Sequence, residues 1–171
     1  MIRSRVLPFA LVLLVAVAAC GDDDDGAGPA PADPIDALVG SYTTQSFKYT
    51  AVANPALNVD LATIPPGLGI TALTVSADGS FVGSATLEVG GEFVAIPANG
   101  NLTDVTTSSL TINFVGEPAA SVLPNPLPVT YSLSGNVLSF SATGVNFDFS
   151  VIGVGESVDT PSVLDVVLLK S

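Results

Sequence analysis

The run YSLSGNVLSF, residues 131–140, decides the fold of this chain. The Gly-Asn pair at its centre is typical of a two-residue β-hairpin turn, and apolar residues alternate with serines on both sides. With this turn, Leu133 opposes Leu138 and Tyr131 opposes Phe140, so the apolar residues share one face. Turn chemistry and hydrophobic pattern therefore predict the same register, which indicates an antiparallel sheet with one buried face.

Two other turns predict further hairpins of this kind. A two-residue Gly-Gly turn pairs Leu87 with Val94, again on one face. A three-residue loop with Gly79 in the left-handed conformation pairs Val75 with Phe81. The chain is therefore expected to run as local up-and-down hairpins in succession.

From Leu38 onward, Val, Ile, Thr, Phe and Tyr dominate, and Gly, Pro, Asn and Asp recur at intervals of about ten residues. No window shows a sustained helical period, so the fold class is all-β. We expect an antiparallel up-and-down barrel of about eight strands, because closure removes exposed edges; a β-sandwich is the alternative. The candidate strands are Tyr42–Thr50, Ile70–Ser76, Phe81–Val89, Phe93–Pro97, Leu110–Val115, Val129–Leu133, Val137–Ala142, Val145–Val151 and Val163–Leu169.

The N-terminus is built like a secretory signal. Arg3 and Arg5 precede a 14-residue apolar stretch, residues 6–19, and small residues lead up to Cys20. The stretch is too short to cross about 30 Å of hydrocarbon as a helix. Cys20 resembles the lipid-modified residue of bacterial lipoprotein signals. This resemblance implies that residues 1–19 are a lipoprotein signal peptide and that acyl chains on Cys20 anchor the protein to a membrane.

Residues 20–37 are predicted to be the lipidated cysteine followed by an acidic Gly/Pro/Ala linker, and residues 38–171 a single domain. The four aspartates at 22–25 repel one another and extend the linker. This run is similar to the outward sorting signals of some bacterial lipoproteins. We expect the protein to be anchored in the cell envelope, at the outer membrane. Both the periplasmic face and the cell surface are consistent with the sequence.

The charge and residue content exclude several functions. The formal net charge is −12, and after cleavage Lys48 and Lys170 are the only cations, so no basic patch exists for nucleic acid. The chain has no His, and its single Cys is taken by lipid. A nucleophile paired with His and a zinc site built from His or Cys are therefore excluded. We expect no enzyme, no cofactor and no metal.

The carboxylates are not expected to form a catalytic pair. In the predicted hairpin, Glu88 opposes Phe93 and Glu92 opposes Val89, so the two glutamates fall on opposite faces. Asp148 lies between two phenylalanines and is expected on the outer face. Asp165 is expected at the rim or in solvent, since an inward carboxylate would need a partner.

Several motifs of residues 38–171 resemble the bacterial lipocalin-like domains. Leu38-Val39-Gly40-Ser41-Tyr42 is similar to their Leu-hydrophobic-Gly-x-Trp start, with Tyr42 where Trp is usual and no Arg in the mature chain to stack on it. The 78–81 turn, the 131–140 hairpin and the closing 165–170 strand resemble the corresponding family elements. The resemblance implies a barrel with room for a small apolar molecule.

The function expected is that of a non-catalytic, envelope-anchored binding module for a small apolar ligand. The alternative is a structural or interaction module with a filled barrel that contacts another envelope protein, through an apolar patch near residues 64–66 or 122–124. The candidate cavity residues are Phe81, Leu87, Val94, Leu133, Phe140, Phe147 and Phe149.

Overall fold

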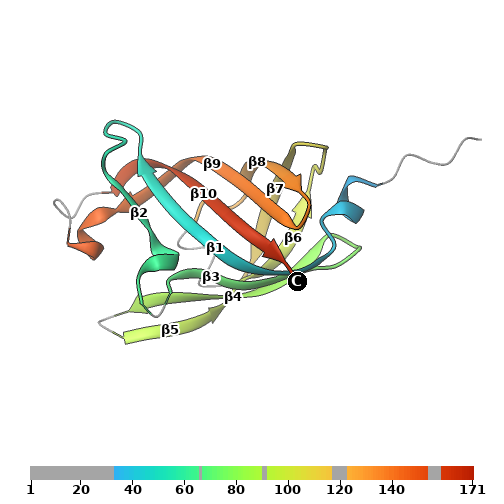
Figure 1. Ribbon diagram of the computed structural model, residues 1–171, viewed down its shortest axis with the longest axis horizontal. Coiled ribbons are helices and arrows are strands. Elements are labelled where there is room, and N and C mark those ends of the chain that lie inside the picture. The colour runs from blue at the N-terminus through green and yellow to red at the C-terminus, as the bar shows by residue number, and fades with distance from the viewer. Residues whose placement is uncertain (1–32, 66, 90–91, 117–122, 154–158) are drawn as a thin grey trace, which may run out of the picture. The chain divides into compact units, whose positions relative to one another are not determined.

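The computed structural model describes residues 33–65, 67–89, 92–116, 123–153 and 159–171, apart from the side chains of 87–89 and 151 (Figure 1). The predicted signal peptide, Cys20 and most of the predicted linker lie outside these residues. Ala32–Ser171 form one compact unit.

The elements of the described residues are almost all strands, joined by short 3-10 turns. In chain order they are η1 (Pro34–Ala37), β1 (Gly40–Ala51), β2 (Asn58–Asp60), η2 (Leu61–Thr63), β3 (Gly69–Val75), β4 (Ser80–Val89), β5 (Glu92–Pro97), β6 (Asn99–Thr103), β7 (Ser109–Val115), β8 (Leu127–Ser134), β9 (Val137–Asp148), η3 (Phe149–Ile152) and β10 (Asp159–Lys170). The all-β fold class is confirmed.

The strands form a closed antiparallel barrel. Its order is β1-β3-β4-β6-β7-β8-β9-β10, and β10 pairs again with β1. β2 and β5 lie off this ring: β2 pairs with the end of β1, and among the described strands β5 pairs with β4 alone (Figure 1). The expected eight-stranded barrel is confirmed and the sandwich alternative is wrong, because the long strand β1 pairs along both of its edges.

The predicted hairpin registers are confirmed. Leu133 opposes Leu138 and Tyr131 opposes Phe140 across β8 and β9. The β3–β4 hairpin also has the expected three-residue loop, with Gly79 at φ 80°. These registers are set by turns of two or three residues, so local sequence is enough to predict them.

The prediction of which segments build the barrel was partly wrong. Residues 93–97 were expected to form a strand of the meander, but they form β5, outside the ring. The missing barrel strand is β6, whose Asn-Gly-Asn sequence is typical of a turn. Gly100 is needed there because a Cβ would lie 2.6 Å from the Phe81 ring and 2.0 Å from the Asn113 carbonyl oxygen.

The two predicted strands over residues 137–151 are one strand, β9, which ends at Asp148. A bulge opposite β10 changes the register, from Ala142 opposite Leu164 to Val145 opposite Ser162. Gly144, at φ 73°, lies in this bulge and lets the strand bend without ending.

One end of the barrel is closed by residues near both ends of the domain. Tyr42 is 1% exposed, and its hydroxyl donates a hydrogen bond to the Leu38 carbonyl oxygen at 2.7 Å. Lys170 Nζ lies 5.9 Å from the centre of the Tyr42 ring. Gly40 makes room for this arrangement, because a Cβ there would lie 2.5 Å from Lys170 Cε. Lys170 therefore places a cation over the Tyr42 ring, where the mature chain has no arginine to stack.

Residues 33–37, at the end of the predicted linker, pack against the closed end of the barrel. Asp33 caps η1 by accepting a hydrogen bond from the Ile35 amide at 3.0 Å. Ile35 is buried with the core residues, and Lys170 donates to the Ala37 carbonyl oxygen at 3.4 Å. The last residues of the predicted linker therefore help to cover the closed end.

We predict that Tyr42→Phe lowers the free energy of unfolding by about 1–3 kcal/mol, because it takes the donor from a buried carbonyl. Tyr131→Phe is the matched control, since its hydroxyl donates to the Thr106 carbonyl oxygen at 2.6 Å in an exposed position where water replaces it. Urea denaturation of both variants and the wild type measures the difference. Equal losses would contradict the role given to Tyr42.

Candidate functional site

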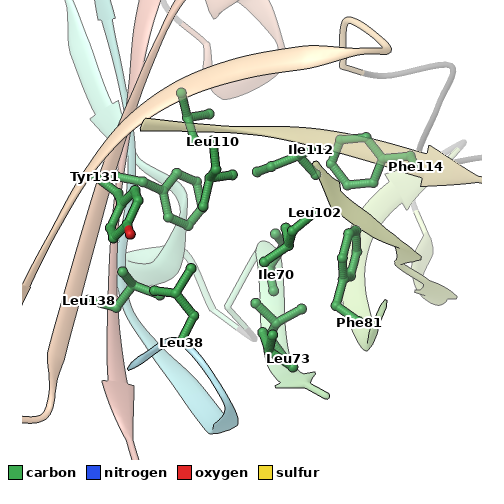
Figure 2. A pocket seen from close by; sticks show the side chains of 13 residues that line it. Leu38, Ile70, Leu73, Phe81, Leu102, Leu110, Ile112, Phe114, Tyr131 and Leu138 are labelled. Atoms are coloured by element: carbon green, nitrogen blue, oxygen red, sulfur yellow. The ribbon is translucent and has the colours of Figure 1, made fainter. Parts of the chain in front are cut away.

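The barrel interior contains two spaces, which we call the inner and outer chambers. Ile70 in β3 and Phe114 in β7 line both of them, so these side chains lie where the chambers meet. The inner chamber lies toward the closed end, with Leu38 and Leu138 in its wall (Figure 2). The outer chamber lies toward the other end, where η3 follows β9.

The inner chamber has a volume of about 40 Å³. Figure 2 shows the aliphatic side chains of Ile70, Leu73, Leu102 and Leu110 around it. Its wall is apolar, so a water molecule there would lack the two or more polar partners that it needs. The inner half of the barrel is therefore a packed core with a small void.

The outer chamber is larger, with a volume of about 250 Å³. This is close to the lower limit of about 300 Å³ for pockets that hold small molecules. Its apolar wall includes the small residues Ala85 and Ala98, which leave space that larger side chains would fill. Its rim carries Asn146 and Asp159, both exposed, so the chamber opens to solvent on this side.

One wall of the outer chamber is aromatic. Tyr49 stacks on Phe147, with ring centres 4.3 Å apart and planes at 19°. Phe47 meets Tyr49 edge-on at 5.8 Å, and Phe149 meets Phe147 edge-on at 5.0 Å. Gly69 permits this packing, since a Cβ there would lie 2.7 Å from the Phe47 ring. An aromatic surface therefore extends from β1 to β9.

The Tyr49 hydroxyl is the buried polar group of this wall. Tyr49 is 3% exposed, and its hydroxyl has no hydrogen-bond partner among the described residues. In the same residues, every side-chain polar atom sealed from solvent does have a partner. The Tyr49 hydroxyl must therefore reach open space, and the space that Tyr49 lines is the outer chamber. Burial raises the pKa of this phenol well above its usual range.

Two carboxylates stand at the rim of the chamber. Asp148 ends β9 and accepts a hydrogen bond from the Ser150 amide at 2.9 Å, which caps η3. Asp159 begins β10 and is the register partner of Asp148. Asp148 lies between the chamber residue Phe147 and the buried Phe149, and its register partner Asp159 is exposed, so alternation places Asp148 on the outer face at the edge of the chamber, as expected. Asp165 borders a groove on the outer face, as expected.

The predicted cavity residues occupy different places. Phe81 and Phe140 line the inner chamber, and Phe147 lines the outer one. Phe149 is buried behind Phe147, and Leu133 packs against the core without lining either chamber. Val94 is 42% exposed on β5, outside the barrel. The Leu87 side chain lies outside the described residues.

Sequence reasoning missed Tyr49, Phe47, Ile70 and Phe114 as chamber residues. Phe47 and Tyr49 lie two residues apart in a predicted strand, so period-two alternation already places both aromatics on one face. This alternation is enough to identify the two aromatics as neighbours on one face. Phe114 lies at the end of its strand, and only the closed barrel brings it against Ile70.

In the described part of the chain, the acidic side chains do not gather into a catalytic pair or a metal site. Glu88 opposes Phe93 and Glu92 opposes Val89, the register predicted for opposite faces. Among the described side chains, no three His, Cys, Asp or Glu residues gather closely enough to hold a metal ion. No helix in the described ranges is long and apolar enough to span a membrane.

No family model matches this sequence, and no curated protein or solved structure is detectably similar to it. The lipocalin-like resemblance therefore stays a prediction about family.

We predict that Tyr49 is the last tyrosine to ionise in an alkaline titration followed by phenolate absorbance. Its raised pKa means that the fold favours the neutral phenol. This contribution to stability is complete below the ordinary pKa of about 10 and is lost as the pH rises above it. In Tyr49→Phe the last step should disappear. Ionisation of Tyr49 together with Tyr131, without unfolding, would contradict the assigned burial.

Proposed function

We propose that this protein is a non-catalytic, envelope-anchored lipoprotein that holds a small apolar molecule in the outer chamber of its barrel. The observation that carries the proposal is the chamber itself: about 250 Å³ of mostly apolar space that opens at a polar rim and borders a buried phenol with no partner among the described residues. A few polar groups in an apolar pocket are the usual composition of a ligand site.

The outer chamber is the site because the rest of the interior is filled. The inner chamber, at about 40 Å³, is too small for an organic ligand. The closed end is sealed by Tyr42 and Leu38, which are 1% and 0% exposed. A ligand would therefore enter at the open end, past Asn146 and Asp159, and stop against Ile70 and Phe114.

The anchoring part of the proposal rests on the sequence around Cys20. The charged start, the apolar stretch and the small residues before Cys20 support cleavage ahead of this residue and acylation of its thiol. Several acyl chains give lasting attachment, at about 0.8 kcal/mol per buried CH₂. The domain would then stand off the outer membrane on an acidic linker, in the periplasm or at the cell surface.

Binding of 1-octanol to the full chain tests the chamber. We predict that Ala85→Leu weakens octanol binding at least about tenfold, since the added side chain fills space that Ala85 leaves open. Ala72→Leu is the matched control, because Ala72 is exposed on the neighbouring strand β3. Native mass spectrometry and calorimetry measure both variants. Absence of octanol binding to the wild type would overturn the proposal.

The alternative, an interaction module with a filled barrel, is favoured by one observation. Among the described strands β5 pairs with β4 alone, and its Phe93 and Val94 are 50% and 42% exposed on opposite faces of the hairpin. An apolar edge strand is a surface on which another envelope protein can dock. The expected patches differ from this: Ile64 and Leu123 are partly buried against the core, and Leu123 lines the outer chamber.

We predict that Cys20→Ser leaves the protein without acyl chains, so that it moves from the membrane fraction to the aqueous fraction. The reason is that Cys20 is the only cysteine in the chain. Fractionation in the native host and the mass of the N-terminal peptide measure the change. A wild-type N-terminal peptide of unmodified mass would contradict the anchor.

A further inference from the structure

The Tyr49 phenol is held in a fixed position in the wall of the outer chamber. Its backbone is paired on both sides, opposite Leu164 in β10 and opposite Val59 in β2. Its ring stacks on Phe147 with 4.3 Å between the ring centres, and Phe47 packs edge-on against it at 5.8 Å. Strand pairing and ring packing therefore position the hydroxyl without any contribution from a ligand.

The Tyr49 hydroxyl differs from the other two tyrosine hydroxyls of the chain. Tyr42 donates to the Leu38 carbonyl oxygen at 2.7 Å, and Tyr131 donates to the Thr106 carbonyl oxygen at 2.6 Å. Tyr49 is 3% exposed and has no hydrogen-bond partner among the described residues. A buried donor is thus available at the wall of the chamber, and a bound molecule can supply its acceptor.

This free donor makes the chamber selective for what fills it. A ligand that occupies the chamber displaces the water that otherwise reaches the phenol. A hydrocarbon would leave the hydroxyl unpaired, which costs affinity, whereas a ligand with an oxygen acceptor replaces the lost water. Because burial raises the pKa of Tyr49, the phenol keeps its proton and remains a donor at neutral pH.

The chamber offers no counter-charge to an anionic acceptor. No described residue of its wall is a lysine or an arginine. Lys48 opposes Asp165, which borders a groove on the outer face, and Lys170 lies over Tyr42 at the closed end. A carboxylate in the chamber would lose its hydration without gaining an opposite charge. The acceptor that suits this wall is therefore an uncharged oxygen.

A carbonyl oxygen fits this requirement better than a hydroxyl. Inside the rim, the Tyr49 hydroxyl is the only polar side-chain group among the described lining residues. An alcohol would bring a second donor, and one of the two donors would then have no acceptor. A carbonyl group only accepts, so it pairs with the phenol and leaves no donor over.

We propose that the outer chamber binds a neutral apolar carbonyl compound, a ketone or an ester, whose carbonyl oxygen accepts a hydrogen bond from the Tyr49 hydroxyl. Its hydrocarbon part extends from Tyr49 toward Ile70 and Phe114, which lie where the two chambers meet. This inference rests on the proposed function, since it names the class of ligand that the chamber takes.

Two probes of matched shape test the hydrogen bond: 2-octanone, and 2-methyl-1-octene, in which a CH₂ group replaces the carbonyl oxygen. Headspace gas chromatography measures the binding of both to the full chain carrying Cys20→Ser. We expect Tyr49→Phe to weaken 2-octanone binding about fivefold, through the loss of one neutral hydrogen bond, and not to weaken 2-methyl-1-octene binding. Tyr131→Phe is the matched control, because its hydroxyl is already bonded to Thr106, and it should leave both affinities unchanged.

Infrared spectroscopy of bound 2-octanone reads the contact directly in the wild type. A hydrogen bond lowers the carbonyl stretching frequency, so the bound ketone should absorb at a lower wavenumber than in hexane. In Tyr49→Phe the band should return toward its position in hexane, and in Tyr131→Phe it should stay shifted. A band of the wild-type complex at the hexane position would overturn the proposed contact, whatever the variants do.

The outcomes separate this inference from the proposed function. If neither probe nor 1-octanol binds, the ligand-binding function fails. If both probes bind and Tyr49→Phe changes them equally, the chamber is a ligand site but the carbonyl class is wrong. Octanoate, an anion at neutral pH, tests the charge: binding as tight as that of 2-octanone would overturn the neutral class. Weakening of 2-octanone alone, together with the shifted band, supports both proposals.

Discussion

Every functional feature of this protein depends on the backbone pairing between β1 and β10. Their register runs from Tyr42 opposite Lys170 to Ala51 opposite Ser162, so the first and last strands of the domain close the barrel along almost their whole length. Without this pairing the sheet would have two open edges and no interior. With it, Tyr49 of β1 stacks on Phe147 of β9 in the wall of an enclosed space. The chambers are consequences of closure rather than of any single side chain.

The two ends of the barrel differ because the strands around β1 and β4 differ along their length. Near the closed end, β1 pairs with β3 and β4 pairs with β6. Toward the other end, β2 and β5 take those places, and β5 leaves the ring (Figure 1). Large side chains fill the closed half, whereas Ala85 and Ala98 border the open half. The outer chamber is therefore where the wall residues are small and the strands diverge.

Aromatic side chains give the open end its chemical character. Tyr49 stacks on Phe147, and Phe47 and Phe149 pack edge-on against this pair. Burial raises the pKa of the Tyr49 phenol and so keeps it neutral. The two described lysines lie elsewhere: Lys170 lies over Tyr42 at the closed end, and Lys48 does not line the chamber.

Sequence alone determined the all-β class and the hairpin registers around Leu133–Leu138 and Val75–Phe81. These follow from the period of two and from turns of two or three residues, which are local properties. Tertiary structure alone decided that the Asn-Gly-Asn segment is a barrel strand and that Lys170 covers Tyr42. It also decided that β10 returns to β1 and closes the sheet into a barrel. Each of these depends on contacts between residues far apart in the chain, such as Phe81 on Gly100 and Phe149 in the core, whose fit no local pattern encodes.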